Sequence, residues 1–216
     1  FPGRSPLLLA VHTLSGGMIL LLTVLGLRYH ASPFWLLIPA LVWTTAFLVS
    51  DRFFGILAMF WLALPLAAFL GLGWMGRSVS YDHFLPLSVI VLVWINDTFA
   101  FVVGRLIGKN RITPVLSPGK TWEGFIGGVL FTLAGGWIVF LVSNTYPVAV
   151  WLIFSSVISL AGFLGDLFES RLKRISGIKN MGNLLPGHGG VLDRFDSLLF
   201  AAPMVMLMQI LLNSFK

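Results

Sequence analysis

The chain has 216 residues, of which 57% are hydrophobic and only 10% are charged, and its mean hydropathy is +0.95. Because a soluble domain carries about 25% charged residues, this composition excludes an ordinary soluble protein and predicts a polytopic membrane protein. The absence of cysteine excludes disulfides and thiolate chemistry. The net charge of +6 is typical of basic cytoplasmic loops or of a bound anionic substrate, and not of nucleic-acid binding. The first residue is Phe1, so we expect a piece or processed product of a longer protein.

Seven apolar stretches are long enough to cross a bilayer, since a spanning helix needs about 20 mostly apolar residues. They cover residues 7–27, 33–50, 53–75, 84–104, 124–143, 147–168 and 195–213. We therefore predict an all-α fold, a transmembrane bundle of about seven spans. Residues 1–83 would form N-terminal helices that serve as scaffold or face the lipid. Residues 84–216 would form the region that carries the chemistry, with cytoplasmic loops at 105–123 and 169–194.

The basic residues predict the orientation of the chain. If the N-terminus is cytoplasmic, 11 of the 14 Lys and Arg residues face the cytoplasm and 3 face the other side. This distribution is the positive-inside bias. Trp35, Trp74 and Trp151 would then lie at the outer ends of their spans, as in an aromatic belt. We expect an integral protein of the inner (plasma) membrane with a cytoplasmic N-terminus and a functional site on the cytoplasmic side.

Six of the eight carboxylates are predicted at or near the cytoplasmic ends of the last four spans. They are Asp97, Glu123, Asp166, Glu169, Asp193 and Asp196. Asp97 lies within a span, about two turns from its end, where a carboxylate costs about 2.5–3.5 kcal/mol. This cost indicates a partner, which could be a cation, a metal or a water-filled cavity. A structural ion pair with a nearby Arg or Lys is the alternative.

Two acidic pairs flank the loop at 169–194. Asp166 and Glu169 are three residues apart, so a helix places them on one face, and Asp193 and Asp196 have the same spacing. Mg²⁺ takes one or two carboxylates and leaves positions for phosphate oxygens, while Lys and Arg neutralise the remaining phosphate charge. The pattern therefore indicates phosphoryl or nucleotidyl transfer. An ordinary positive-inside loop would explain the basic residues but not two acidic pairs at one depth.

The segment "SPGKTWEGFIGG", residues 117–128, contains a Gly-Lys-Thr that suggests a phosphate-binding loop. A Walker loop requires glycine where this chain has Pro114, and no strand-like run precedes the segment. We therefore do not predict a Walker loop. Ser117 or Thr121 could cap the next helix, and Lys120 could bind a phosphate at its N-terminus. Helix capping together with a membrane anchor is the alternative.

The stretch from residue 160 to 197 resembles the phosphatidate cytidylyltransferase family, also called CDP-diacylglycerol synthases. The family motif reads roughly S-x-x-K-R-x4-K-D-x-x-x-x-x-P-x-H-G-G-x-x-D-R-x-D. The matching residues are Ser170, Lys173, Arg174, Lys179, Pro186, His188, Gly189, Gly190, Asp193, Arg194 and Asp196. The chain departs at Asn180, where the family has Asp, and we expect this to reduce activity. The blocks "SPGKTWEGFIGG" and "GDLFES" also resemble the family, so the resemblance covers residues 94–200.

This resemblance implies a reaction and a set of site residues. CTP and phosphatidic acid would give CDP-diacylglycerol and pyrophosphate, with Mg²⁺ that a second cation could join. The implied catalytic residues are Asp166, Asp193, Lys173, Arg174 and His188. The implied metal ligands are Asp166 and Asp193, with Asp196 and Asp97 as further candidates. The implied substrate-binding residues are Ser117, Lys120, Thr121, Lys179, Arg194, Gly189 and Gly190.

Two other functions stay open. A nucleotidyl or phosphoryl transferase acting on another lipid phosphate would use the same cation cluster. An ion-coupled transporter could use Asp97 and Asp166 as intramembrane ion sites, but the charged residues concentrate on one side and mark no path through the membrane. Gly124, Gly127 and Gly128 could pack helices closely within one chain or between chains, so a homodimer is an option.

Overall fold

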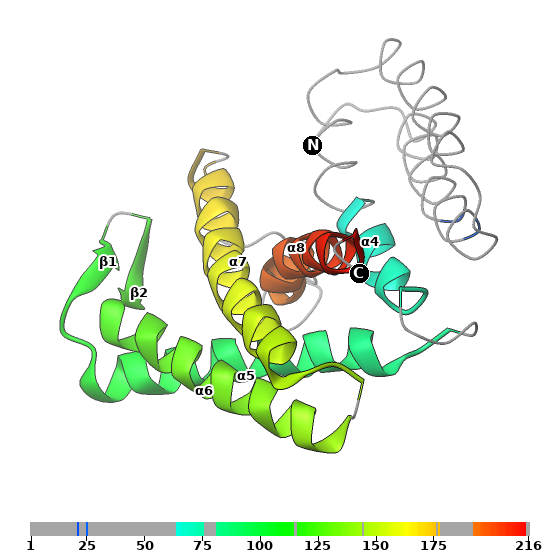
Figure 1. Ribbon diagram of the computed structural model, residues 1–216. Coiled ribbons are helices and arrows are strands. Elements are labelled where there is room, and N and C mark those ends of the chain that lie inside the picture. The colour runs from blue at the N-terminus through cyan, green and yellow to red at the C-terminus, as the bar shows by residue number, and fades with distance from the viewer. Residues whose placement is uncertain are drawn as a thin grey trace, which may run out of the picture. The chain divides into compact units, whose positions relative to one another are not determined.

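The computed structural model describes residues 21, 25, 64–75, 81–114, 116–143, 145–175, 177 and 192–214. The chain forms two compact units, Phe1–Asp82 and His83–Lys216, and Figure 1 shows the elements of both. In the first unit, helix α4 (Leu64–Leu72) falls within the expected span at 53–75. The expected spans at 7–27 and 33–50 lie almost entirely outside the described residues.

The described part of the second unit contains four long helices. They are α5 (Phe84–Ile107), α6 (Trp122–Val142), α7 (Val148–Ile175) and α8 (Leu192–Ser214). Within the described part of the chain, these four are long and apolar enough to cross a membrane. The prediction of a mostly helical integral membrane protein is confirmed, and the four helices match the last four expected spans. Helix α7 runs about two turns further than expected, so Lys173 and Arg174 are helical.

The prediction of an all-α fold is wrong for the segment between α5 and α6. Strands β1 (Arg111–Thr113) and β2 (Ser117–Thr121) form an antiparallel hairpin, in which Arg111 pairs with Thr121 and Thr113 with Ser117. Ile112 and Thr113 are β-branched and suit a strand, and the following Pro114 suits a turn. The hairpin lets a short connection pair its own backbone groups. It also means that "SPGKT" is itself a strand.

Helices α5 and α6 run antiparallel side by side (Figure 1). Glycines of α6, which have no side chain, let it lie directly against α5. A Cβ atom added at Gly124 would lie 2.6 Å from the carbonyl oxygen of Ala100, and one at Gly127 would lie 2.7 Å from Val103. Small residues permit such close helix contacts in membranes. The contact fixes the start of α6 beside the end of α5, where the hairpin connects them.

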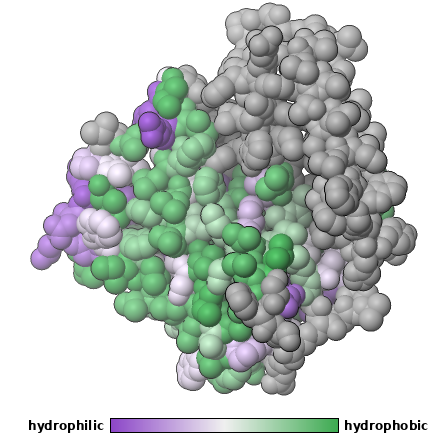
Figure 2. Space-filling model, turned by 45° about the horizontal axis from the view of Figure 1, so that its top comes forward, coloured by the Kyte–Doolittle hydropathy of each residue, from purple (hydrophilic) through white to green (hydrophobic). Residues whose placement is uncertain are grey.

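The interior of the second unit is apolar and centred on α7. Trp151, Phe154 and Ile158 of α7 are fully buried, as are Leu92 of α5 and Val205 of α8. The prediction that Trp151 belongs to an aromatic belt is therefore wrong, because its ring packs in the core. Large apolar side chains also cover the outside, and Figure 2 shows hydrophobic residues over most of the described surface on that face. An exposed apolar surface of this extent suits contact with lipid tails. The four helices therefore pack around a core and present an apolar exterior to a membrane.

Candidate active site

A cavity of about 450 Å³ lies where α5, β2, α6, α7 and α8 meet. Its walls combine charged and hydroxyl groups with three phenylalanine rings. The polar side chains that line it belong to Asn96, Asp97, Ser117, Lys120, Thr121, Asp166, Lys173, Asp196 and Ser197. The chain therefore brings residues that are 100 positions apart in sequence to one concave site. A pocket with convergent polar groups among apolar walls is typical of a binding or active site.

An ion pair joins the hairpin to α7 inside this cavity. Lys120 Nζ lies 2.6 Å from Asp166 Oδ2, and the Lys120 side chain is only 17% exposed. The Ser170 hydroxyl donates to the other oxygen of Asp166 at 3.4 Å. Lys120 Nζ also lies 5.0 Å from the centre of the Phe163 ring, within range of a cation–π interaction. These contacts hold one ammonium group and one carboxylate at a fixed place on the cavity wall.

A second lysine reaches the cavity from α7 itself. Lys173 Nζ lies 3.3 Å from Glu169 Oε1, one helical turn earlier, and the Glu169 side chain is fully buried. A buried carboxylate is costly unless a cation or hydrogen bonds compensate it. Glu169 therefore ties the flexible Lys173 side chain to the inner face of α7, and Lys173 lines the cavity.

The other acidic side chains come from α5 and α8 and are held by hydrogen bonds. Asp97 Oδ1 accepts from Asn96 Nδ2 and from the Ser197 hydroxyl, each at 3.3 Å. Asp196 Oδ1 accepts from the Ser197 backbone N–H at 2.6 Å. On the far side of Asn96, the Thr132 hydroxyl lies 3.5 Å from Asn96 Oδ1. Asp97 is thus held by two neutral hydrogen-bond donors inside an apolar span, and it also lines the cavity. The cost of a carboxylate in a span led us to expect a cation, a metal or a water-filled cavity as its partner, and a cation or metal there stays a prediction.

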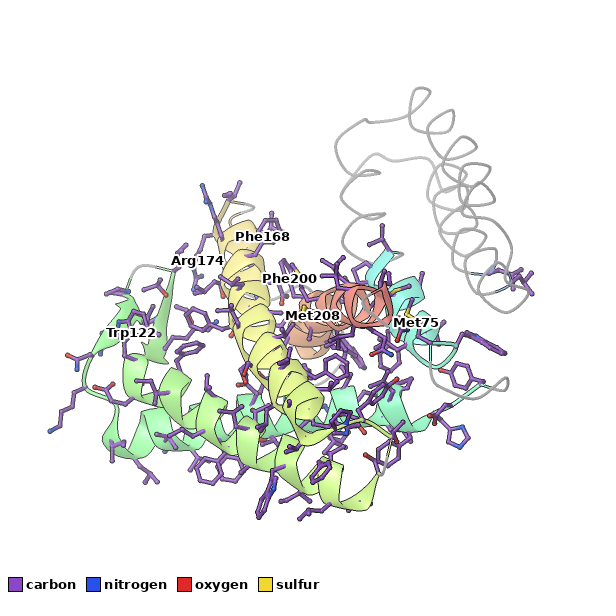
Figure 3. The ribbon with its side chains drawn as sticks, in the orientation of Figure 1. Met75, Trp122, Phe168, Arg174, Phe200 and Met208 are labelled. Carbon is purple, nitrogen blue, oxygen red and sulfur yellow. The ribbon has the colours of Figure 1, made fainter. Side chains whose placement is uncertain are left out.

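The predicted site residues fall into four groups. Those that line the cavity together are Ser117, Lys120, Thr121, Asp97, Asp166, Lys173 and Asp196. Arg174 is exposed at the end of α7, as Figure 3 shows, and does not line the cavity. Lys179, His188, Gly189 and Gly190 lie outside the described residues. Asp193 and Arg194 belong to the first turn of α8, where the structure describes the backbone alone.

Glu123 has a different place from the other acids of its group. Its carboxylate accepts hydrogen bonds from the backbone N–H groups of Lys109 and Asn110, at 3.1 and 3.2 Å, and from Asn110 Nδ2 at 2.7 Å. The Trp122 N–H donates to the Asn110 carbonyl at 2.9 Å, and Figure 3 shows Trp122 at the start of α6. Glu123 therefore fastens the end of α5 to the start of α6 and supports the hairpin between them.

Three residues of the cavity were not predicted from the sequence: Asn96, Phe163 and Ser197. Asn96 and Ser197 each stand next to an aspartate within an apolar span, and both are buried. A polar residue beside an intramembrane acid is a usable signal, because the acid needs a partner. Phe163 carries no comparable signal, because a single aromatic residue in a span is ordinary. Its role depends on Lys120, which is distant in sequence.

The donor set of the cavity fits Mg²⁺. Asp97, Asp166 and Asp196 offer carboxylate oxygens, which are the ligands that Mg²⁺ prefers. Among the described residues, no group of three or more His, Cys, Asp or Glu side chains converges on one point. Mg²⁺ needs only one or two carboxylates when phosphate oxygens complete its shell. The cavity therefore suits a metal ion that arrives with a phosphorylated substrate.

The fold and the cavity define a class of protein: a polytopic helical membrane protein with a cavity lined by lysines and carboxylates. The sequence model of the Cytidylyltransferase family matches residues 5–212. The chain belongs to this family, which confirms the resemblance seen in its motifs.

Curated bacterial proteins are also similar in sequence to this chain. A phosphatidate cytidylyltransferase of Staphylococcus saprophyticus is 42% identical over 151 residues, which are 66% of this chain and 57% of the relative. A phosphatidate cytidylyltransferase of Staphylococcus aureus is 40% identical over 149 residues, 66% of this chain and 56% of the relative. The chain thus spans less than three fifths of the length of these curated relatives.

Proposed function

We propose that the protein transfers the cytidylyl group of CTP to phosphatidic acid, giving CDP-diacylglycerol and pyrophosphate in a Mg²⁺-dependent reaction. The observation that carries this proposal is the cavity in which Lys120 and Lys173 face Asp97, Asp166 and Asp196. Relatives named phosphatidate cytidylyltransferase support the choice of substrates. An enzyme that joins two phosphate-bearing molecules needs both kinds of group, cations for the substrates and carboxylates for a metal.

The chemistry requires no nucleophile from the protein. A phosphate oxygen of phosphatidic acid attacks the α-phosphorus of CTP, a new P–O bond forms, and the bond to the β-phosphate oxygen breaks as pyrophosphate leaves. Lys120 and Lys173 offset the repulsion between the two anions and orient them. When bound, Mg²⁺ would neutralise charge on the phosphate oxygens, and Asp166, Asp196, Asp97 and Asp193 are the residues that would hold it.

We further propose that the cavity opens at the cytoplasmic face of the inner membrane. The cavity lies at the hairpin end of α5 and α6, and Arg105, Lys109 and Arg111 gather there. Positive charge on this scale is typical of a cytoplasmic end. CTP would enter from the cytoplasm, while the lipid phosphate would approach from the headgroup level of the membrane.

A turnover assay tests the proposal directly. Purified protein in phosphatidic acid micelles receives labelled CTP and Mg²⁺, with Asp166→Asn beside it and Asp82→Asn as a control outside the cavity. We expect labelled CDP-diacylglycerol from the wild type and the control, and loss of product without Mg²⁺ or with Asp166→Asn. If product forms only with a different lipid phosphate, that lipid and not phosphatidic acid is the substrate. No product from any lipid phosphate would overturn the proposal.

A further inference from the structure

We infer that Ser197 is a positioning residue that sets the two acidic groups of α5 and α8 for a divalent cation. The inference deepens the proposed function and rests on it for the identity of the reaction. Ser197 is 3% exposed, lies at the cavity wall and follows Asp196 directly in sequence. Its two polar groups reach two different carboxylates, which lie on different helices.

The geometry gives Ser197 a double role. Its backbone N–H donates to Asp196 Oδ1 at 2.6 Å, and its hydroxyl donates to Asp97 Oδ1 at 3.3 Å. Asn96 Nδ2 donates to the same oxygen of Asp97 at 3.3 Å. Because both hydrogen bonds end on Oδ1, the orientation of the carboxylate is fixed through one oxygen while Oδ2 can serve a cation. Residues of this kind orient carboxylate ligands and tune their affinity for metal.

Neighbouring helices keep this arrangement rigid. A Cβ atom at Gly162 of α7 would lie 3.4 Å from Ser197 Cβ and 3.8 Å from Asn96 Nδ2. A Cβ atom at Gly128 of α6 would lie 3.0 Å from Asn96 Oδ1. The backbones of α6 and α7 therefore close over the group from both sides. Helices α5, α6, α7 and α8 therefore meet at Ser197 and Asn96.

A fixed arrangement matters for this cation in particular. Mg²⁺ demands near-ideal octahedral geometry and tolerates little displacement of its ligands. Two carboxylates at one cavity repel each other and would turn apart unless donors hold them. Substitution of Ser197 by alanine removes the hydroxyl donor of Asp97 but keeps the backbone donor of Asp196. The change is therefore directed at Asp97.

The test measures metal binding separately from turnover. Mn²⁺ binding to the purified chain is followed by electron paramagnetic resonance in the presence of CTP, for the wild type and Ser197→Ala. The matched control is Ser155→Ala, which removes an equally buried hydroxyl that donates to the Trp151 carbonyl at 2.8 Å and lies away from the cavity. We expect Ser197→Ala to weaken Mn²⁺ binding about 10-fold and to raise the Mg²⁺ concentration for half-maximal turnover similarly. Ser155→Ala should leave both values unchanged.

A double variant identifies the group through which Ser197 acts. If the hydroxyl serves Asp97, the variant Ser197→Ala/Asp97→Asn binds Mn²⁺ no more weakly than Asp97→Asn alone. A further loss in the double variant, wild-type binding by Ser197→Ala, an equal loss in Ser155→Ala, or no Mn²⁺ binding by the wild type would each overturn the inference. Wild-type protein that binds Mn²⁺ but makes no CDP-diacylglycerol would contradict the proposed function. The role of Ser197 would then be decided by the Mn²⁺ affinities of the variants alone.

Discussion

Lys120 Nζ lies 2.6 Å from Asp166 Oδ2, so the residue before the N-cap of α6 is joined directly to the inner face of α7. Both groups line the cavity. Under the proposed function, Lys120 would bind a phosphate of CTP, and Asp166 would be one of the residues that hold Mg²⁺. The ion pair compensates both charges in a partly buried place.

Substitution of Lys120 by methionine should lower kcat/KM for CTP by about 100-fold, the effect of removing one preorganised donor from a charged transition state. Methionine keeps the length of the side chain and loses its charge. Arginine should retain more activity than methionine because it keeps the charge. The measurement is the rate of CDP-diacylglycerol formation over a range of CTP concentrations.

Lys109→Met is the matched control for this change. Lys109 is exposed and is not among the residues that line the cavity, so its substitution should leave the rate close to that of the wild type. An equal loss in both variants would mean that Lys120 contributes only to the general positive charge of this end of the protein.

We expect Glu123 to support activity by fastening the hairpin between α5 and α6, and not by binding the metal. Its carboxylate accepts from the Lys109 and Asn110 N–H groups and from the Asn110 side chain. Alanine at this position removes both acceptor oxygens and with them these hydrogen bonds, so we expect faster proteolysis of the 108–121 segment and a higher KM for CTP. The loss of activity should be smaller than for Lys120→Met. Limited proteolysis followed by mass spectrometry locates the cleavage.

The Mg²⁺ dependence separates the two roles of Glu123. If Glu123 only fastens the hairpin, its substitution leaves the Mg²⁺ concentration for half-maximal turnover unchanged. Glu123→Gln keeps one oxygen acceptor, so its proteolysis rate and its KM for CTP should lie between those of the wild type and Glu123→Ala. A large increase in the Mg²⁺ requirement would instead place Glu123 among the metal ligands.

The sequence allowed the four described spanning helices to be predicted closely, because long apolar runs between basic ends leave few other structures in a membrane. The span expected at 84–104, for example, is observed as Phe84–Ile107. The hairpin escaped prediction because its strands have three and five residues, too few for a period to be detected. Sequence motifs predicted Lys120, Asp166 and Asp196 as site residues. The contact between Ser197 and Asp97 depends on which helix faces meet, which spacing within one helix cannot define.

Thr121 begins α6 by accepting a hydrogen bond from the Gly124 N–H at 3.2 Å. Substitution by alanine should lower the free energy of unfolding by about 1 kcal/mol, the usual cost of losing an N-cap side chain. Serine keeps the oxygen and should preserve most of the stability. The measurement is an unfolding titration in detergent. Equal losses for serine and alanine would show that the Thr121 methyl group, and not the cap, stabilises this end of the helix.

Gly124 tests whether close contact between α5 and α6 holds the cavity together. A Cβ atom there would lie 2.6 Å from the Ala100 carbonyl oxygen and 3.0 Å from Gly104 Cα, both of them rigid backbone atoms. Alanine gains about 0.5–1 kcal/mol of helix propensity over glycine, but overpacking costs about 1–3 kcal/mol. We therefore expect Gly124→Ala to be destabilised on balance.

Gly119 supplies the comparison, because a Cβ atom there meets nothing within 4 Å. Gly119→Ala should change the unfolding free energy by less than about 0.5 kcal/mol, measured in the same detergent titration. If Gly124→Ala were as stable as the wild type, α6 would have to shift away from α5. The distance from Lys120 to Asp166 would then change too, so such a variant should be stable but slow in the turnover assay. Stability and activity that both remain at wild-type values would contradict the packing described here.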